Sequence, residues 1–406
     1  MRKSYLVLLA ITCIWINKSY SLTMAVDIDF YGETETIFYH NSILEHPSYV
    51  FDESYYQFYY EQAESSILFE DCMENLKKIK TQRKLNDFLY YKLIHKAVDV
   101  ILKKEKEPIR NLFKWFLLTK SGFNTRIVAR GNDVTIHVYT HDLVYGSPQS
   151  RSKGGYWVDI TSFHNDINYK KFKPLKSKFY PNKEGIPFSF ALNEIPLVYE
   201  PKIIVKEIDY KYEGKPQTIS VSVDKGYVNF LKKYPEVSLT LHGQAALSPT
   251  LTGSFIKELK NRVAGKSKQD AVRYLMSFTR TAFKYKNDLE PDDEDDENSE
   301  KEDDEEQLKR IIFFPEESLL ETESDYEDRS VLLYSLIKNV VNEDPIFVKI
   351  SKMTSVAVNF GDTIGRPIPH DSLIYALCEP TESIDTLEIG EFPKKYEHRY
   401  FKVFKQ

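Results

Sequence analysis

The pattern of apolar and polar positions divides the chain into segments of different character. From Tyr55 to about Lys104, apolar residues recur at intervals of three and four, which predicts amphipathic helices. Another helix is expected after Pro108, ending at Ser121-Gly122, which is a common C-terminal stop. Alternating residues then predict strands over Thr125–Ala129, Val134–Tyr139 and Tyr156–Ile160. We therefore expect residues 22–164 to form an N-terminal α+β domain.

Residues 165–253 change to short alternating stretches interrupted by prolines. The clearest strands are Ile203–Ile208 and Thr218–Val223, and the segment Glu213–Pro216 between them is typical of a turn. Strands of this length joined by turns are typical of a β-sandwich. This pattern predicts a β-sandwich-like middle domain.

Residues 254–406 begin with a long amphipathic stretch, Ser254–Asn287, and later contain a sharply capped apolar helix. Ser324 and Asp325 are candidate N-cap residues, and acidic side chains in the first turn suit the positive end of the helix dipole. The apolar positions of the helix keep a helical spacing, at Val331, Leu332, Leu336 and Val340. We interpret the charged residues at its start as a structural cluster in which an acid pairs with the arginine: Asp325, Glu327, Asp328 and Arg329.

An acidic block precedes this helix. Residues 290–306 contain thirteen acidic side chains and one lysine, a composition typical of a solvated, disordered loop. An alternative interpretation is an acidic fringe that gathers Ca²⁺ or a basic partner. The block lacks the spaced Asp/Asn ligands and central glycine of a structured calcium loop, so we expect no cofactor and no metal site.

The run from Phe313-Phe314-Pro315-Glu316-Glu317 to Ser324-Asp325-Tyr326-Glu327-Asp328-Arg329 resembles the transglutaminase-like (papain-like) superfamily. In that family a proline and glutamates precede Asp-Cys-Glu-Asp-Arg and an apolar helix, and this version is most similar to exported members from Bacteroidota-type bacteria. The resemblance implies a papain-like α+β core at the C-terminus. It also places three residues on the family's Cys, His and Asp positions: Tyr326, Met353 in the strand-like run Val348–Phe360, and Glu379 before Pro380-Thr381.

All three triad positions are therefore changed. A tyrosine with an ordinary pKa near 10 is a poor nucleophile at neutral pH, and methionine cannot accept a proton. The resemblance then implies a pseudoenzyme with no catalytic residues. The alternative is a cysteine peptidase, amidase or acyl transferase that uses relocated residues, for which Cys378 and His370 are the only candidates near Glu379. The other histidines show no metal-ligand spacing.

The N-terminal segment resembles the same core a second time. Its helices are followed by Gly122-Phe123-Asn124-Thr125-Arg126 and by Trp157-Val158-Asp159-Ile160-Thr161, where family members have Gly-Ile-Pro-Ala-Arg and Trp-Val-x-Val-Asp-Pro-Thr. The resemblance implies a second degenerate core, with Glu107 at the cysteine position, Asn132 or Asp133 at the histidine position, and Asp159 retained. An unrelated α+β domain with the same order of elements is the alternative.

The first 21 residues have the character of a signal peptide. Arg2 and Lys3 precede an apolar run from Tyr5 to Ile16, which is shorter than the ~20 residues of a membrane helix. Lipidation at Cys13 is a weaker alternative, because the apolar run continues beyond it. We expect an exported protein of the periplasm or cell surface with no transmembrane segment after cleavage.

Composition narrows the partner classes. Loss of residues 1–21 would change the formal net charge from −6 to −9, which disfavours nucleic acid as a partner. Only Cys72 and Cys378 would then remain; two buried free thiols are favoured over one long-range disulfide. The function expected from sequence is a binding or scaffold module of the cell envelope for a peptide, glycan or envelope protein.

Overall fold

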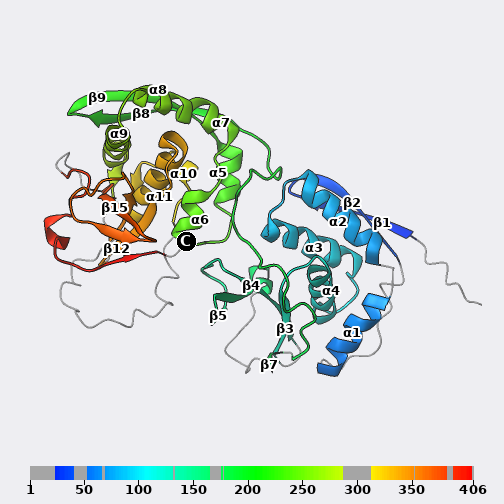
Figure 1. Ribbon diagram of the computed structural model, residues 1–406. Coiled ribbons are helices and arrows are strands. Elements are labelled where there is room, and N and C mark those ends of the chain that lie inside the picture. Colours follow the sequence, from blue (N-terminus) through cyan, green and yellow to red (C-terminus); the bar gives the residue numbers. More distant parts are fainter. Residues whose placement is uncertain are drawn as a thin grey trace, which may run out of the picture.

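The computed structural model describes residues 23–40, 53–65, 69–130, 133–164, 175–176, 178–286, 312–351, 353–381 and 387–404. The chain is a mixed α+β protein with two lobes (Figure 1). We call residues 23–200 the first lobe and residues 201–404 the second lobe. The predicted signal peptide and the acidic block 290–306 lie outside the described residues.

The first lobe contains a β-hairpin, four α-helices and a five-stranded antiparallel sheet. Its elements are β1 (Thr23–Phe30), β2 (Glu33–His40), α1 (Glu53–Ser65), α2 (Glu70–Gln82), α3 (Asp87–Ile101), α4 (Glu107–Lys120), β3 (Thr125–Arg130), β4 (Asp133–Thr140), β5 (Gln149–Ser152), β6 (Gly155–Asp159), the 3-10 helix η3 (Ile160–Phe163) and β7 (Leu175–Lys176). The helices and three strands predicted from the apolar pattern of this region are confirmed, whereas the β1–β2 hairpin was not foreseen.

The second lobe follows a similar order. Its elements are β8 (Ile203–Tyr212), β9 (Lys215–Asp224), α5 (Lys225–Leu231), α6 (Leu239–Gln244), α7 (Pro249–Leu251), the π-helical η4 (Thr252–Ile256), α8 (Lys257–Val263), α9 (Lys268–Thr281), β10 (Lys284–Tyr285), α10 (Pro315–Ser318), β11 (Glu323–Ser324), α11 (Tyr326–Leu336), the π-helical η6 (Ile337–Val341), β12 (Ile346–Ile350), β13 (Met353–Val358), β14 (Ile368–His370), β15 (Leu373–Cys378), the 3-10 helix η7 (Lys394–Tyr396) and β16 (Phe401–Val403).

The five-stranded sheets of the two lobes have the same topology. The strand orders are β5-β6-β4-β3-β7 and β14-β15-β13-β12-β16, so both sheets read 3-4-2-1-5 when their strands are numbered along the chain. Every neighbouring pair in both sheets is antiparallel. In each lobe one helix packs on the second strand of the sheet: α4 on β4, and α11 on β13. The fifth residue of each helix donates a hydrogen bond to the backbone of that strand, Asn111 to Val134 O at 2.8 Å and Ser330 to Thr354 O at 2.9 Å.

Each lobe also begins with a two-stranded hairpin closed by a two-residue turn ending in glycine. Tyr31 and Gly32 have positive φ in the first hairpin, as do Glu213 and Gly214 in the second, which is the requirement of a type I′ turn. The first hairpin packs on α2 and α3, and the second packs on α7 and α9. The two lobes therefore share the same order of elements along the chain: a hairpin, helices, a central helix and a sheet.

The β-sandwich-like middle domain predicted for residues 165–253 is wrong for the described part of that range. There, β7 completes the first sheet, and β8–β9 is a lone hairpin whose apolar face packs with the second lobe. Tyr210 of β8 lies against Tyr274 and Phe278 of α9. The alternating pattern was real, but one apolar face of a hairpin can pack on helices as well as on a second sheet.

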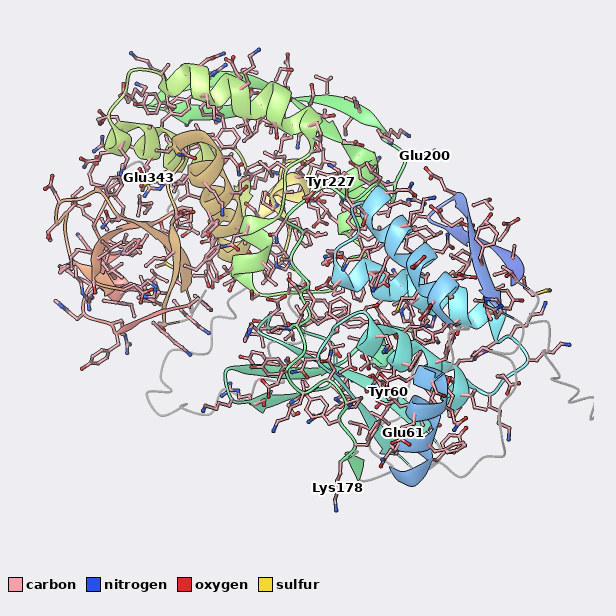
Figure 2. The ribbon with its side chains drawn as sticks, turned by 45° about the vertical axis from the view of Figure 1, so that its right-hand side comes forward. Tyr60, Glu61, Lys178, Glu200, Tyr227 and Glu343 are labelled. Atoms are coloured by element: carbon pink, nitrogen blue, oxygen red, sulfur yellow. The ribbon has the colours of Figure 1, made fainter. Side chains whose placement is uncertain are left out.

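Side chains of both lobes meet around α5. Tyr227, Phe230 and Leu231 of this helix belong to the core of the first lobe, whereas Val228 belongs to that of the second. Figure 2 shows Tyr227 near the junction of the lobes, with Tyr60 far from it on α1. Within the described ranges, no helix combines the length and the apolar character needed to cross a bilayer.

Candidate functional site

The sequence motif that carries the family resemblance folds into the start of α11. Asp325 is the N-cap, because its side chain accepts from Asp328 N at 2.9 Å, and the Asp328 side chain accepts in return from Asp325 N. The helix therefore begins at Tyr326, as the capping residues predicted. Every residue of α11 is buried, so its N-terminus lies inside the lobe.

Tyr326 occupies the position that the family resemblance assigns to the nucleophile. It is only 3% exposed, and its ring lies 6.1 Å from that of Tyr285. A group that acts on a substrate must reach it, and the Tyr326 side chain is enclosed. The geometry places a packed aromatic residue where the resemblance implies an open nucleophile.

Arg329 links four segments around this helix start. It is 1% exposed and donates to Ser324 Oγ at 2.9 Å, Phe283 O at 2.7 Å, Arg280 O at 3.2 Å and Thr381 O at 3.3 Å. Burial lowers the pKa of Arg329, and the nearby carboxylates, Glu379 first among them, oppose this shift. These four hydrogen bonds go to three carbonyls and a hydroxyl, and the pairing of Arg329 with an acid stays a prediction.

The acidic residues around the helix start hold backbone N–H groups. Asp328 accepts from Phe313 N at 2.9 Å, Glu317 accepts from Phe314 N at 2.9 Å, and Glu316 accepts from the backbone and hydroxyl of Ser248. Burial raises the pKa of Glu316 and Glu317 to about 7. Burial, followed by the Asp325 carboxylate, raises the pKa of Asp328 to about 8. Glu327 is also buried, 8% exposed. Through these hydrogen bonds, the acidic side chains hold α10 and the two residues before it in place.

Of the other two triad positions, Glu379 lies near Tyr326 and Met353 does not share its surroundings. Glu379 follows β15, is 1% exposed, and accepts from Thr381 N at 2.8 Å. The pKa of Tyr285 is raised mainly by burial, and the nearby Tyr326 and Glu379 side chains both raise it further. Glu379 and Tyr326 therefore both lie near Tyr285, which is 39% exposed.

Met353 is the first residue of β13 and faces away from α11. Val356 and Val358 belong to the core that contains the apolar residues of α11, whereas Met353 and Ala357 belong to a separate cluster with Ile350. Because consecutive side chains of a strand point to opposite faces of the sheet, Met353 and Ala357 lie on the face of β13 opposite to Val356 and Val358. The predicted single strand Val348–Phe360 is in fact two, β12 and β13, joined at Ser351, whose φ is 55°. Sequence spacing could not reveal this turn, since it lacks glycine and proline.

In the first lobe, two of the three residues named from the resemblance occupy places like those of Tyr326 and Glu379 in the second lobe. Glu107 is the first residue of α4, as Tyr326 is of α11, and it is exposed. Asp159 ends β6, is fully buried, and accepts from Thr161 N at 2.9 Å, which repeats the Glu379–Thr381 contact. Asp133 is exposed at the start of β4, and Asn132 lies outside the described residues.

The residue that lies beside Asp159 is His137. The two are directly paired across β4 and β6, with Nε2 of His137 3.5 Å from Oδ2 of Asp159. Asp133 instead pairs with Arg130 in the β3–β4 turn region. His137 was not among the site residues predicted from the sequence. It could have been found by pairing the predicted strands Val134–Tyr139 and Tyr156–Ile160 in register, since this pairing places it opposite Asp159.

Cys72 and Cys378, the two cysteines among the described residues, are free and buried, which confirms the favoured alternative for this pair. Burial raises the pKa of the Cys72 thiol to about 12 and that of Cys378 further. Cys378 packs in the core of the second lobe, and His370 lies on β14 with Nε2 3.3 Å from Asp371. In the described part of the chain, no three His, Cys, Asp or Glu side chains are arranged to hold a metal ion.

Comparisons with protein-family models, curated proteins and solved structures gave no match to this chain.

Proposed function

We propose that the chain is a non-catalytic protein of the transglutaminase-like, papain-like type, acting as a binding or scaffold module in the cell envelope. The observation that carries the proposal is the enclosed Tyr326 at the start of α11, where the sequence motif calls for an accessible thiol. The separation of Met353 from that helix start supports it, because a base must lie within hydrogen-bond reach of the group it serves.

The recurring topology supports two degenerate cores, one in residues 22–164 and one in residues 254–406. In both lobes a helix begins at the position aligned with the nucleophile, and a carboxylate after the fourth strand accepts from a threonine two residues later. A duplicated unit that keeps its framework without its catalytic residues suits binding. The proposed partner is a peptide, a glycan or an envelope protein, after export and removal of residues 1–21.

The catalytic part of the proposal is tested by assays of amide hydrolysis and of amine transfer. We compare the unmodified protein, Tyr326→Cys, and Tyr326→Cys combined with Met353→His, and expect no turnover in any of them. The new thiol would lie at a helix N-terminus, which lowers a thiol pKa, but the residue at position 353 faces the wrong side of β13 to serve it. Turnover by the unmodified protein that is lost in Cys378→Ser or His370→Ala would establish the relocated enzyme instead.

The binding part is tested by titrating the protein with panels of peptides and oligosaccharides. Saturable binding of one class would identify the partner chemistry. Mass measurement of the protein after expression in a bacterium tests export, since cleavage near residue 21 is expected and an intact N-terminus in the exported fraction would contradict it.

A further inference from the structure

Three charged or titratable side chains form a row across the sheet of the first lobe. Arg126 of β3 is paired directly with His137 of β4, and His137 is paired with Asp159 of β6. The neighbours of these residues along the strands, Ile127, Val138 and Val158, belong to the core that the sheet shares with α4. By alternation, the row lies on the opposite face of the sheet.

The row contains buried polar atoms that lack a protein partner. Nε and Nη2 of Arg126 and both ring nitrogens of His137 have no hydrogen bond to any part of the chain that the structure describes. His137 is only 7% exposed, so water does not freely solvate its ring. Buried polar groups are nearly always hydrogen-bonded in folded proteins, and exceptions call for an unseen partner.

The Arg126 guanidinium is positioned as a flat, rigid donor. Its carbon lies 4.0 Å from the centroid of the Trp157 ring, and this stacking leaves the edges of the guanidinium free to point sideways. The two unpartnered atoms, Nε and Nη2, form one of those edges and can donate two parallel hydrogen bonds to a carboxylate or phosphate. Burial lowers the pKa of Arg126 to about 10, a loss that a bound anion would offset.

The other end of the row orients the histidine. Asp159 uses Oδ1 to accept from Thr161 N and presents Oδ2 to Nε2 of His137. Nδ1 of His137 is the ring nitrogen left to hydrogen-bond with a group lying next to Arg126. Arg126 is half-buried while His137 and Asp159 are buried, so a ligand would enter at the β3 end of the row.

We infer that Arg126 and His137, oriented by Trp157 and Asp159, form a binding site for an oxyanion, either a carboxylate or a phosphate group. The site lies on the first lobe and goes beyond the proposed function, which rests on the start of α11. This inference holds whether or not the second lobe is catalytic.

The experiment is calorimetric titration of the full chain with acetate, succinate, inorganic phosphate and sulfate at constant ionic strength, with chloride as the background anion. We expect saturable binding. Tighter binding of acetate or succinate would indicate a planar carboxylate as the ligand group, and tighter binding of phosphate or sulfate would indicate a tetrahedral one. Arg126→Gln should abolish binding, and Arg126→Lys should weaken it roughly tenfold, because lysine keeps the charge but loses the two-pronged donor. His137→Asn should weaken binding several-fold.

The matched control is Lys77→Gln, which removes an exposed positive charge from α2 and should leave the affinity unchanged. Circular dichroism and melting curves show whether each variant is folded, and Arg126→Lys provides a test if Arg126→Gln does not fold. Unchanged affinity in a folded Arg126 variant, or the absence of saturable binding by all four anions to the unmodified protein, would overturn the inference.

Discussion

At the scale of single residues, Arg329 and Asp325 both stabilise the start of α11. Arg329 supplies hydrogen bonds to the ends of α9 and β15, and Asp325 caps α11. Both roles need the same residue types that an active site would place there. The sequence predicted a structural cluster at these residues, but it could not give the partners of Arg329, because those carbonyls are 46 to 52 residues away along the chain.

We predict that Arg329→Leu destabilises the protein far more than Asp325→Ala does. Loss of Arg329 leaves buried carbonyls without donors and Glu379 without its nearby positive charge, which should cost about 3–5 kcal/mol, whereas an N-cap aspartate is typically worth ~1 kcal/mol. The measurement is the free energy of unfolding in urea, with Lys257→Ala on the exposed face of α8 as the control. Equal losses for the two variants would show that Arg329 is not the central link.

At the scale of elements, the turn of α10 depends on carboxyl groups that are unusually easy to protonate. Glu316 and Glu317 have a pKa of about 7 and Asp328 one of about 8, against ordinary values near 4. Between pH 5 and 8 the folded state therefore holds more protons than the unfolded chain. The stability contributed by these groups is fully present only below the unfolded pKa values near 4, and it is lost progressively as the pH rises from there through 7 and 8.

We predict that the free energy of unfolding is larger at pH 5 than at pH 8.5, and that Glu316→Gln flattens this dependence. Glutamine keeps the shape of the side chain and cannot ionise. Glu61→Gln, which replaces an exposed acid on α1 (Figure 2), should leave the pH profile unchanged. Urea unfolding at a series of pH values measures the profile, and a stability that rises from pH 5 to 8.5 would contradict the prediction.

The elements themselves were largely predictable, and their partners were not. Periodicity located α4, α11 and the three strands β3, β4 and β6 of the first sheet. The β8–β9 hairpin has an equally clear face, yet the sequence does not say whether that face meets another sheet or a helix such as α9. The same limit explains Met353 and His137: the strand positions were found, but the turn at Ser351 and the pairing of β4 with β6 decided which side chains meet.

At the scale of the whole molecule, the two lobes share packing through the motif itself. Phe314, just before α10, belongs to the core of the first lobe and reaches it through Tyr234: its ring lies 6.1 Å from that of Tyr234, which lies 5.5 Å from the ring of Phe88 on α3. The neighbouring Glu316 binds Ser248 at the start of α7 in the second lobe. The segment therefore joins two units of the same topology, and this gives its Phe-Pro-Glu-Glu sequence a structural role.

We predict that Phe314→Ala uncouples the lobes. Removing a fully buried phenylalanine typically costs about 3–5 kcal/mol, and here the loss falls on the contact between the lobes as well as on one core. The unmodified chain should unfold in a single calorimetric transition, and the variant should show two, with the first lobe melting earlier. Phe58→Ala on α1, where the ring is 45% exposed, removes the same side chain without touching the junction and should keep one transition. A single transition in Phe314→Ala, merely shifted to lower temperature, would mean that the other contacts between the lobes, such as those of α5 and the pairing of Val144 with Val237, are enough to hold them together.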